Sequence, residues 1–152
     1  MTDLSVRPNA PFDLAPLARL LATEEDVALV NPNAKFPFDP AEWQEKWLNE
    51  PDDASFYVLD ASGREIGFFA LRVGIGPEVR HLVYVFIEEE ARGGAGKQLA
   101  EMAEDAARDL GAMSVTLKAE TDNEAAMRLY EGAGYEELGR RRGMATMRKD
   151  VA

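Results

Sequence analysis

The sequence predicts a single mixed α/β domain that spans residues 1–152. Strand-like apolar runs alternate along the chain with segments whose apolar residues recur at helical spacing. A length of 152 residues is enough for one domain with a substantial hydrophobic core. Apolar residues make up 46% and charged residues 30% of the chain, which is the balance of an ordinary globular protein.

The first part of the chain is expected to form a strand, two helices and a hairpin. "LSVRP" at 4–8 predicts a short strand, and apolar residues at helical spacing predict a helix over about 12–22. Asp39 followed by Pro40 is typical of a helix start, with the acid as N-cap and the proline at the first helical position. "SFYVLD" and "REIGFFALRV" enclose the turn "ASG", and this pattern predicts a hairpin.

The second part is expected to form a central strand, two helices and three further strands. "RHLVYVFI" is apolar almost without interruption, as expected of a central strand covered on both faces. "MSVTLKA", "YEELGR" and "MATMRKDV" predict the remaining strands, and Gly111 and Gly134 stand where the two helices end. The inward helix faces are expected to comprise Leu99, Met102, Ala103, Ala106 and Leu110 in the first helix and Ala126, Leu129, Tyr130 and Ala133 in the second.

Composition narrows the classes of function. The formal net charge of −11 and the lack of a basic cluster argue against nucleic-acid binding. The chain has no cysteine and a single histidine, His81, so neither a thiolate nucleophile nor a metal site is expected. No apolar run is long enough to span a membrane, and the N-terminus lacks the pattern of a secretion signal. We therefore expect a cytoplasmic protein without a membrane partner.

Residues 88–103, "EEEARGGAGKQLAEMA", join the central strand to the next helix through three glycines. Backbone N–H groups at a helix start have no intrahelical partner, and the helix dipole adds partial positive charge there. Glycine lets a phosphate approach such a backbone closely, and Arg92 and Lys97 add full positive charge. The pattern matches neither a P-loop nor a dinucleotide-binding fingerprint. A phosphate site and a plain strand-to-helix turn both remain open.

"FIEEEARGGAGKQLAEMA" resembles the acyl-coenzyme A loop of the GNAT superfamily of N-acetyltransferases, which has the form Q/R-x-x-G-x-G/A. Gly94 and Gly96 take the two glycine positions. Ala91 stands at the Q/R position, which is a departure from the family pattern. Arg92, one place later, or Lys97 would have to supply the cation instead.

A second segment, "NEAAMRLYEGAGY" at 123–135, resembles the family's N-x-x-A-x-x-L-Y-x-x-x-G-[FY] motif. The matching positions are Asn123, Ala126, Leu129, Tyr130, Gly134 and Tyr135. Each motif alone is weak, but both occur in the family's order and at its spacing. The resemblance covers about residues 80–150 of this chain.

The resemblance implies a GNAT-like fold and acetyl-coenzyme A as cosubstrate. In that fold four helices flank a mixed, mostly antiparallel sheet of six or seven strands, splayed between the fourth and fifth strands. Phe86 and Ile87 would then pair with the pantetheine arm. The pyrophosphate would lie on the loop formed by Arg92, Gly93, Gly94, Ala95, Gly96 and Lys97. Asn123 matches a cofactor-contacting position, and it is equally suited to be the N-cap of its helix.

The resemblance also implies direct acetyl transfer to an amine, without a covalent enzyme intermediate. Tyr130 matches the family tyrosine that protonates the leaving thiolate as general acid, and its alternative is a core aromatic. The amine must lose a proton before it attacks. Glu78 and His81 are the candidate bases, and His81 is also suited to be a hydrogen-bonded core residue.

Three functions fit this sequence. The first is an N-acetyltransferase that acts on a primary amine of a small molecule or peptide. The second is a catalytically weak module of the same fold that binds acyl-coenzyme A as a sensor or scaffold. The third is a non-catalytic acidic interaction domain whose glycine loop is structural. Dimers are common in the family, so a homodimer is among the expected assemblies.

Overall fold

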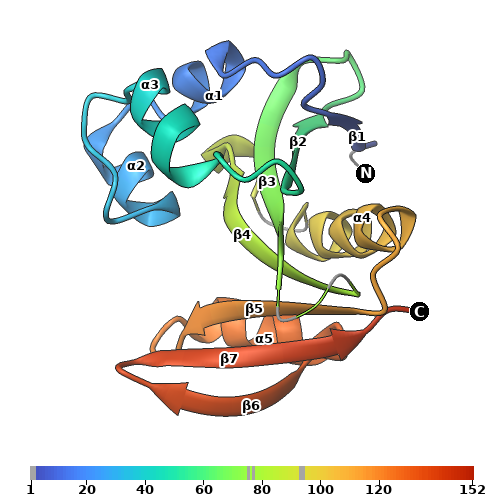
Figure 1. Ribbon diagram of the computed structural model, residues 1–152. Helices are drawn as coiled ribbons and strands as arrows, with labels where there is room; N and C mark the ends of the chain where they lie inside the picture. Colours follow the sequence, from blue (N-terminus) through green and yellow to red (C-terminus); the bar gives the residue numbers. More distant parts are fainter. Residues whose placement is uncertain (1–2, 75, 77, 93–94) are drawn as a thin grey trace. The chain divides into compact units, whose positions relative to one another are not determined.

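The computed structural model describes residues 3–74, 76, 78–92 and 95–152 of the chain. Its strands are β1 (Ser5–Pro8), β2 (Ala54–Leu59), β3 (Glu65–Val73), β4 (Val79–Ile87), β5 (Ser114–Glu120), β6 (Glu136–Arg141) and β7 (Met144–Asp150) (Figure 1). They form one seven-stranded sheet in the order β1-β2-β3-β4-β5-β7-β6. β4 and β5 pair in parallel, whereas β1–β2, β5–β7 and β6–β7 are antiparallel pairs. The predicted mixed, mostly antiparallel sheet is confirmed.

The described part of the chain contains five α-helices, one more than predicted. They are α1 (Ala15–Leu20), α2 (Glu24–Val30), α3 (Pro40–Glu42), α4 (Ala95–Asp109) and α5 (Glu124–Gly132). The additional helix is α2, whose only buried residue is Val27, so it lacks a clear apolar stripe. Its signal in the sequence is the N-cap Thr23, whose side chain accepts a hydrogen bond from the Asp26 N–H.

The two predicted helices of the first part differ in how well their bounds were predicted. α1 is shorter than the predicted range 12–22, because Asn9 and Asp13 side chains accept hydrogen bonds from the N–H groups of Asp13 and Ala15. These local turns compete with helix formation up to Ala15. The start of α3 is as predicted, since Asp39 caps the helix through the Ala41 N–H, and α3 continues into a π-helical turn (Trp43–Trp47).

The contacts within the chain define two compact units. Unit 1 comprises Met1–Ala70 and Tyr84–Arg92, and unit 2 comprises Leu71–Val83 and Gly93–Ala152. The boundaries between the units fall inside β3 and β4, so each of these strands contributes to both. That the whole chain acts as one domain stays a prediction.

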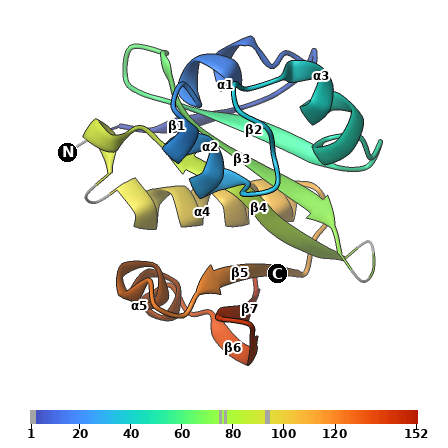
Figure 2. The same cartoon turned by 90° about the vertical axis from the view of Figure 1, so that its left-hand side faces the viewer.

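Aromatic side chains dominate the core of unit 1. Trp43 is fully buried, stacks on Phe38 at 5.4 Å between ring centroids and meets the Tyr84 ring edge-on at 5.1 Å. Tyr57 and Phe68 are also fully buried, and their rings meet at 5.3 Å. The helices α1, α2 and α3 lie on one side of β1, β2 and β3 (Figures 1 and 2). Trp43 is therefore a packing residue.

Unit 2 contains β5, β7 and β6 with the helices α4 and α5, together with the end of β3 and the start of β4. β5 pairs with β7 along its whole length, and the predicted hairpin between β6 and β7 turns at Arg142 and Gly143, which both have positive φ. Gly111 follows the end of α4, as predicted, with φ of +88°.

The buried helix faces in unit 2 differ from the predicted stripes. The residues of α4 that are buried are Ala95, Leu99, Ala100, Ala103, Glu104 and Ala107. Leu110, which was predicted to lie inward, is 38% exposed. In α5 the predicted inward residues are all half-buried, and the fully buried residue is Met127, which the predicted stripe left out. The prediction gave weight to large apolar residues such as Leu110. The structure shows that α4 packs mainly through its alanines.

β4 is divided between the two units. Its pairing with β5 runs from Val79↔Ser114 to His81↔Thr116. Three residues later Tyr84 has φ of 57°, a conformation that is rare for a bulky side chain. Even-numbered residues of β4 are buried, whereas His81 and its odd-numbered neighbours up to Val85 are half-buried. The prediction of a strand covered completely on both faces is therefore wrong for the face that carries His81.

Candidate active site

At the end of β4, in unit 1, the backbone N–H and C=O groups of every second residue point towards β3. A Cβ added at Gly67 would come within 2.6 Å of the Phe86 carbonyl oxygen. The Glu88 N–H donates to the Ile66 carbonyl at 2.9 Å. Because backbone groups alternate in direction along a strand, Ile87 faces away from β3. Phe86 and Ile87 were both predicted to pair with a pantetheine arm. Only the backbone groups of Ile87 point away from β3 and are therefore directed to the opposite edge of β4.

Arg92 folds back onto this strand end. Its Nε donates to the Ile87 carbonyl at 2.8 Å, and its guanidinium carbon lies 5.4 Å from the centroid of the Phe86 ring. Such a cation–π contact restrains an exposed guanidinium. Ala91, in the predicted Q/R position, ends a short 3-10 turn (Glu89–Ala91) immediately before it. The positive charge next to the strand end is therefore held by Arg92.

The predicted phosphate loop continues into α4. Gly93 and Gly94 lie outside the described residues. The first turn of α4, Ala95–Lys97, contributes backbone N–H groups that lack partners within the helix, and Lys97 is exposed. A Cβ at Gly96 would come within 3.0 Å of a Leu129 methyl group. Gly96 thus allows α4 to approach α5, a reason for this glycine that the sequence alone did not reveal.

Asn123 is the N-cap of α5. Its side-chain oxygen accepts a hydrogen bond from the Ala126 N–H at 3.1 Å. Of the two roles that the sequence left open, the capping role is confirmed, and the contact with a cofactor stays a prediction.

Tyr130 lies near the C-terminal end of α5, and its ring packs edge-on against Tyr135 at 5.6 Å. The chain is turned there by Gly134, whose φ is +99°, and the Tyr135 N–H donates to the Tyr130 carbonyl at 2.9 Å. Burial raises the pKa of the Tyr130 hydroxyl above the ordinary value of 10.0. This hydroxyl therefore keeps its proton throughout the neutral pH range.

The two candidate bases lie near the start of β4. Glu78 is exposed, in the turn that precedes the strand. The Nδ1 atom of His81 lies 2.9 Å from the Thr116 hydroxyl oxygen. Burial, with smaller contributions from Lys118 and Arg72, lowers the pKa of His81 below 6.5. His81 is therefore mainly neutral at pH 7, which is the form able to accept a proton.

Two charged residues that the sequence did not single out lie beside the tyrosines. Glu104 of α4 is 5% exposed and pairs with Lys149 of β7, with the ammonium nitrogen 2.8 Å from the carboxylate oxygen. Their signal in the sequence was weak, because an acid in the middle of a charged helix is usually solvated.

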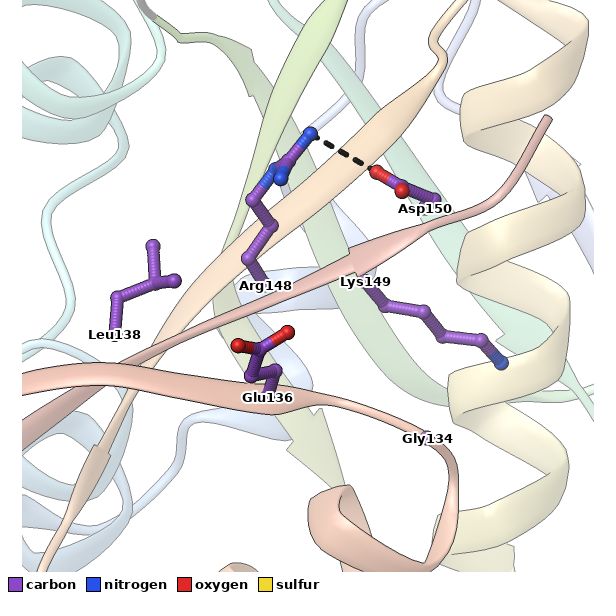
Figure 3. Close-up of a pocket in the computed structure, with 6 residues that line it drawn as sticks. All are labelled: Gly134, Glu136, Leu138, Arg148, Lys149 and Asp150. Atoms are coloured by element: carbon purple, nitrogen blue, oxygen red, sulfur yellow. Dashed lines mark ion pairs between the residues drawn. The ribbon is translucent and has the colours of Figure 1, made fainter.

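A shallow depression of about 300 Å³ lies on unit 2 (Figure 3). Its lining residues are Gly134, Glu136, Leu138, Arg148, Lys149 and Asp150. None of them is a predicted site residue. Within the described ranges, no three His, Cys, Asp or Glu side chains are arranged to hold a metal ion. No helix of those ranges is long and apolar enough to cross a membrane.

Comparison with known proteins decides the family. The model of the "Acetyltransferase (GNAT) family" matches residues 20–135, which is most of the chain. The chain belongs to the GNAT family. The match begins well upstream of the two motifs that carried the resemblance, and it includes all the predicted site residues.

The curated relatives of this GNAT chain include an uncharacterized N-acetyltransferase of Methanocaldococcus jannaschii. The two are 29% identical over 117 residues, which cover 73% of this chain and 52% of the relative. The chain thus spans about half the length of that protein.

Solved structures support the fold. A putative phosphinothricin N-acetyltransferase superposes with a TM-score of 0.76 at 18% identity and covers 99% of both chains. A spermidine N-acetyltransferase from Vibrio cholerae, in complex with CoA and spermine, superposes with a TM-score of 0.72 at 21% identity. That alignment covers 95% of this chain and 92% of the Vibrio chain.

Proposed function

We propose that this protein transfers an acetyl group from acetyl-coenzyme A to a primary amine of a small molecule or peptide. Membership of the GNAT family supports the reaction class. The observation that carries the proposal for this chain is the Tyr130 hydroxyl, which burial keeps protonated at the end of α5. Negative charge develops on the sulfur as the carbon–sulfur bond breaks, and a protonated hydroxyl beside it stabilises that charge by donating its hydrogen to the sulfur.

The candidate contacts with the cosubstrate include residues of unit 1 and residues of unit 2. In unit 1 the backbone of Ile87, next to Phe86, is the proposed partner of the pantetheine arm, and Arg92 supplies the positive charge. The Ile87 carbonyl accepts from Arg92 Nε, so a pantetheine amide would have to use the Ile87 N–H or displace that bond. In unit 2 the proposed contacts are the first turn of α4, including Gly96 and Lys97, and Asn123. The unpaired N–H groups and dipole of a 15-residue helix suit a pyrophosphate.

In the proposed mechanism the neutral amine attacks the carbonyl carbon of the thioester. The carbon–sulfur bond breaks, and the sulfur takes the proton of the Tyr130 hydroxyl. The attacking nitrogen loses a proton to a base or to water. Tyr130 then regains a proton from solvent, so the enzyme returns to its starting state. No side chain forms a bond to the acetyl group, which is consistent with a chain that has no cysteine.

His81 and Glu78 stay the two candidate bases, and the structure favours His81. The neutral imidazole of His81 is half-buried, whereas the Glu78 carboxylate is exposed. If either residue is the base, its substitution by Gln removes the acidic limb from the pH profile of kcat/KM. An unchanged limb in both variants would mean that water takes the proton directly.

A cationic amine is the proposed acceptor, in a cytoplasmic enzyme without nucleic-acid or membrane partners. The net charge of −11 favours the approach of cations. One structural neighbour is a spermidine N-acetyltransferase, which makes polyamines the first acceptors to test. A dodecameric structure of the Vibrio cholerae spermidine N-acetyltransferase is also among the structural neighbours, and a homodimer is our proposal for the smallest assembly of this chain.

The test is release of free coenzyme A, measured with a thiol reagent across a panel of polyamines, amino acids, antibiotic amines and peptides. We expect release above the amine-free rate with at least one class. Calorimetry with acetyl-coenzyme A separates the failures. Binding without release for any amine would favour the sensor or scaffold function, and a lack of binding would exclude both functions.

A further inference from the structure

A partly buried ion pair connects α4 to β7 near the proposed general acid. The ammonium nitrogen of Lys149 lies 2.8 Å from Glu104 Oε1, and the Glu104 side chain is only 7% exposed. Figure 3 shows the Lys149 side chain extending from β7 towards α4, whereas Arg148 pairs with Asp150. Burial of the Glu104 carboxylate costs desolvation, and the Lys149 side chain, which is 28% exposed, offsets that cost only in part, so such a pair often gives little net stability. Its location therefore requires another explanation.

The pair lies next to the Tyr135 ring. The Lys149 ammonium lies 5.9 Å from the ring centroid, and its methylene groups pass within 4 Å of the position a Gly134 Cβ would take. The Tyr135 hydroxyl is fully buried and has no partner of hydrogen-bond geometry among the described residues. Burial is the main cause that raises the pKa of the Tyr135 hydroxyl, and the nearby Glu104 carboxylate raises it further. Lys149 and Glu104 are thus both neighbours of Tyr135.

Tyr135 in turn restrains Tyr130. The two rings meet edge-on, with centroids 5.6 Å apart and planes at 74°. The Tyr135 N–H also bonds the Tyr130 carbonyl, so the backbone separation of the two residues is fixed. Any rotation of the Tyr135 ring would open space next to the Tyr130 ring, because closely packed aromatic pairs have few alternative arrangements.

We propose that the Glu104–Lys149 ion pair is a positioning device for Tyr130: it fixes the Tyr135 ring, which holds the Tyr130 hydroxyl in one orientation for proton donation. The inference rests on the proposed function of Tyr130. Glu104 and Lys149 are positioning residues, because they act on Tyr130 only through Tyr135. A small misplacement of a proton donor is enough to slow a reaction substantially.

The test uses Lys149→Met, which keeps an apolar stem and removes the charge, and Glu104→Gln, which keeps size and removes the charge. Arg148→Met is the matched control, because Arg148 is the adjacent residue of β7 and its ion pair with Asp150 is exposed. We expect both pair variants to lower kcat about tenfold with the KM for acetyl-coenzyme A within about twofold. The control should retain kcat within about twofold.

A double-mutant cycle distinguishes positioning from general stability. In a Tyr130→Phe background, Lys149→Met should cause no further loss of kcat, because the hydroxyl that it positions is already absent. Equal losses of kcat in both backgrounds would overturn the proposal.

A second readout needs no turnover. NMR of ring-labelled tyrosine should detect slow flips of the Tyr130 ring in the wild type and in Arg148→Met, and faster flips in Lys149→Met and Glu104→Gln. Unchanged flips in the pair variants would overturn the positioning role even if the enzyme is active. Faster flips in a protein that acetylates no amine would confirm the restraint and refute the proposed function instead.

Discussion

The cores of the two units are built from different side chains. Among the largest fully buried residues, the aromatic ones all belong to unit 1, namely Trp43, Tyr57, Phe68 and Phe69. In unit 2 the comparable residues are Leu71, Val115 and Met147, and the buried face of α4 is mostly alanine. Each unit buries a carboxylate, Glu42 in unit 1 and Glu104 in unit 2, and unit 2 also half-buries His81.

The difference indicates where stability and chemistry reside. Large rings in unit 1 bury much apolar area and hold the shape of its strands. Small residues in unit 2 bring helices close together and leave polar groups in surroundings that change their pKa, as at Tyr130 and His81. We therefore expect substitutions in the aromatic core of unit 1 to reduce mainly stability, and substitutions at Tyr130 or in the first turn of α4 to reduce mainly rate or binding.

The largest effect on stability is expected for Trp43→Ala. Its side chain is fully buried between Phe38 and Tyr84, so truncation leaves a cavity and should cost about 3–5 kcal/mol. Urea denaturation measures the loss. A cost below about 1 kcal/mol would show that the aromatic core of unit 1 does not carry its stability.

Tyr130→Phe should reverse this pattern. Loss of the general acid is expected to lower kcat about a hundredfold, while acetyl-coenzyme A binding stays unchanged. Because burial raises the pKa of Tyr130 above 10.0, its ionisation should not reduce the wild-type kcat below that pH.

Tyr57→Phe is the control in unit 1. The Tyr57 hydroxyl donates to the Asp13 carbonyl at 2.6 Å, and burial raises the pKa of Tyr57 to about 12. Its loss should cost about 1 kcal/mol of stability and leave kcat unchanged. Equal kcat losses in the Tyr57 and Tyr130 variants would remove the distinction between the units.

Gly96→Ala should separate binding from stability inside unit 2. The new methyl group would lie 3.0 Å from a Leu129 methyl group, which would have to move slightly. Alanine has a better helix propensity than glycine, and this gain offsets the cost of that movement. The free energy of unfolding should therefore change by less than about 1 kcal/mol. The Kd for acetyl-coenzyme A should rise about tenfold, since the first turn of α4 loses close access to its N–H groups. Gly132→Ala, where a Cβ meets open space, should leave the Kd unchanged. Calorimetry compares the two variants.

The smallest effect is expected from the pH dependence of stability. The pKa of His81 is lowered in the folded protein, so the unfolded chain binds more protons as the pH falls below 6.5. The wild type should therefore lose stability from pH 6.5 down through the lowered pKa. In His81→Gln this loss should be smaller, which urea denaturation at pH 7 and pH 5 measures. An identical pH dependence in both proteins would contradict the assigned burial of His81.

The sequence predicted the strands and the longer helices well, because alternation, turns and caps are local signals. Asp39 predicted the start of α3, and Gly111 predicted the end of α4. Prediction from the sequence failed for residues whose burial depends on tertiary contacts. Nothing local indicates that Glu104 is buried, since its partner Lys149 lies 45 residues away.

The candidate site was predictable only in part, for the same reason. Tyr130 and Asn123 were predicted from a motif, but the Tyr135 ring and the ion pair beside it depend on how α4, α5 and β7 pack. The interaction of Arg92 with the Ile87 carbonyl was also hidden, although both residues were candidates. A motif thus located the chemistry, and packing determined which neighbours support it.

The most direct test is a crystal structure with bound coenzyme A. If Tyr130 is the proton donor, the sulfur atom will lie within hydrogen-bonding distance of its hydroxyl oxygen, with the pyrophosphate against the first turn of α4. A sulfur atom far from Tyr130, facing any other side chain, would contradict the account.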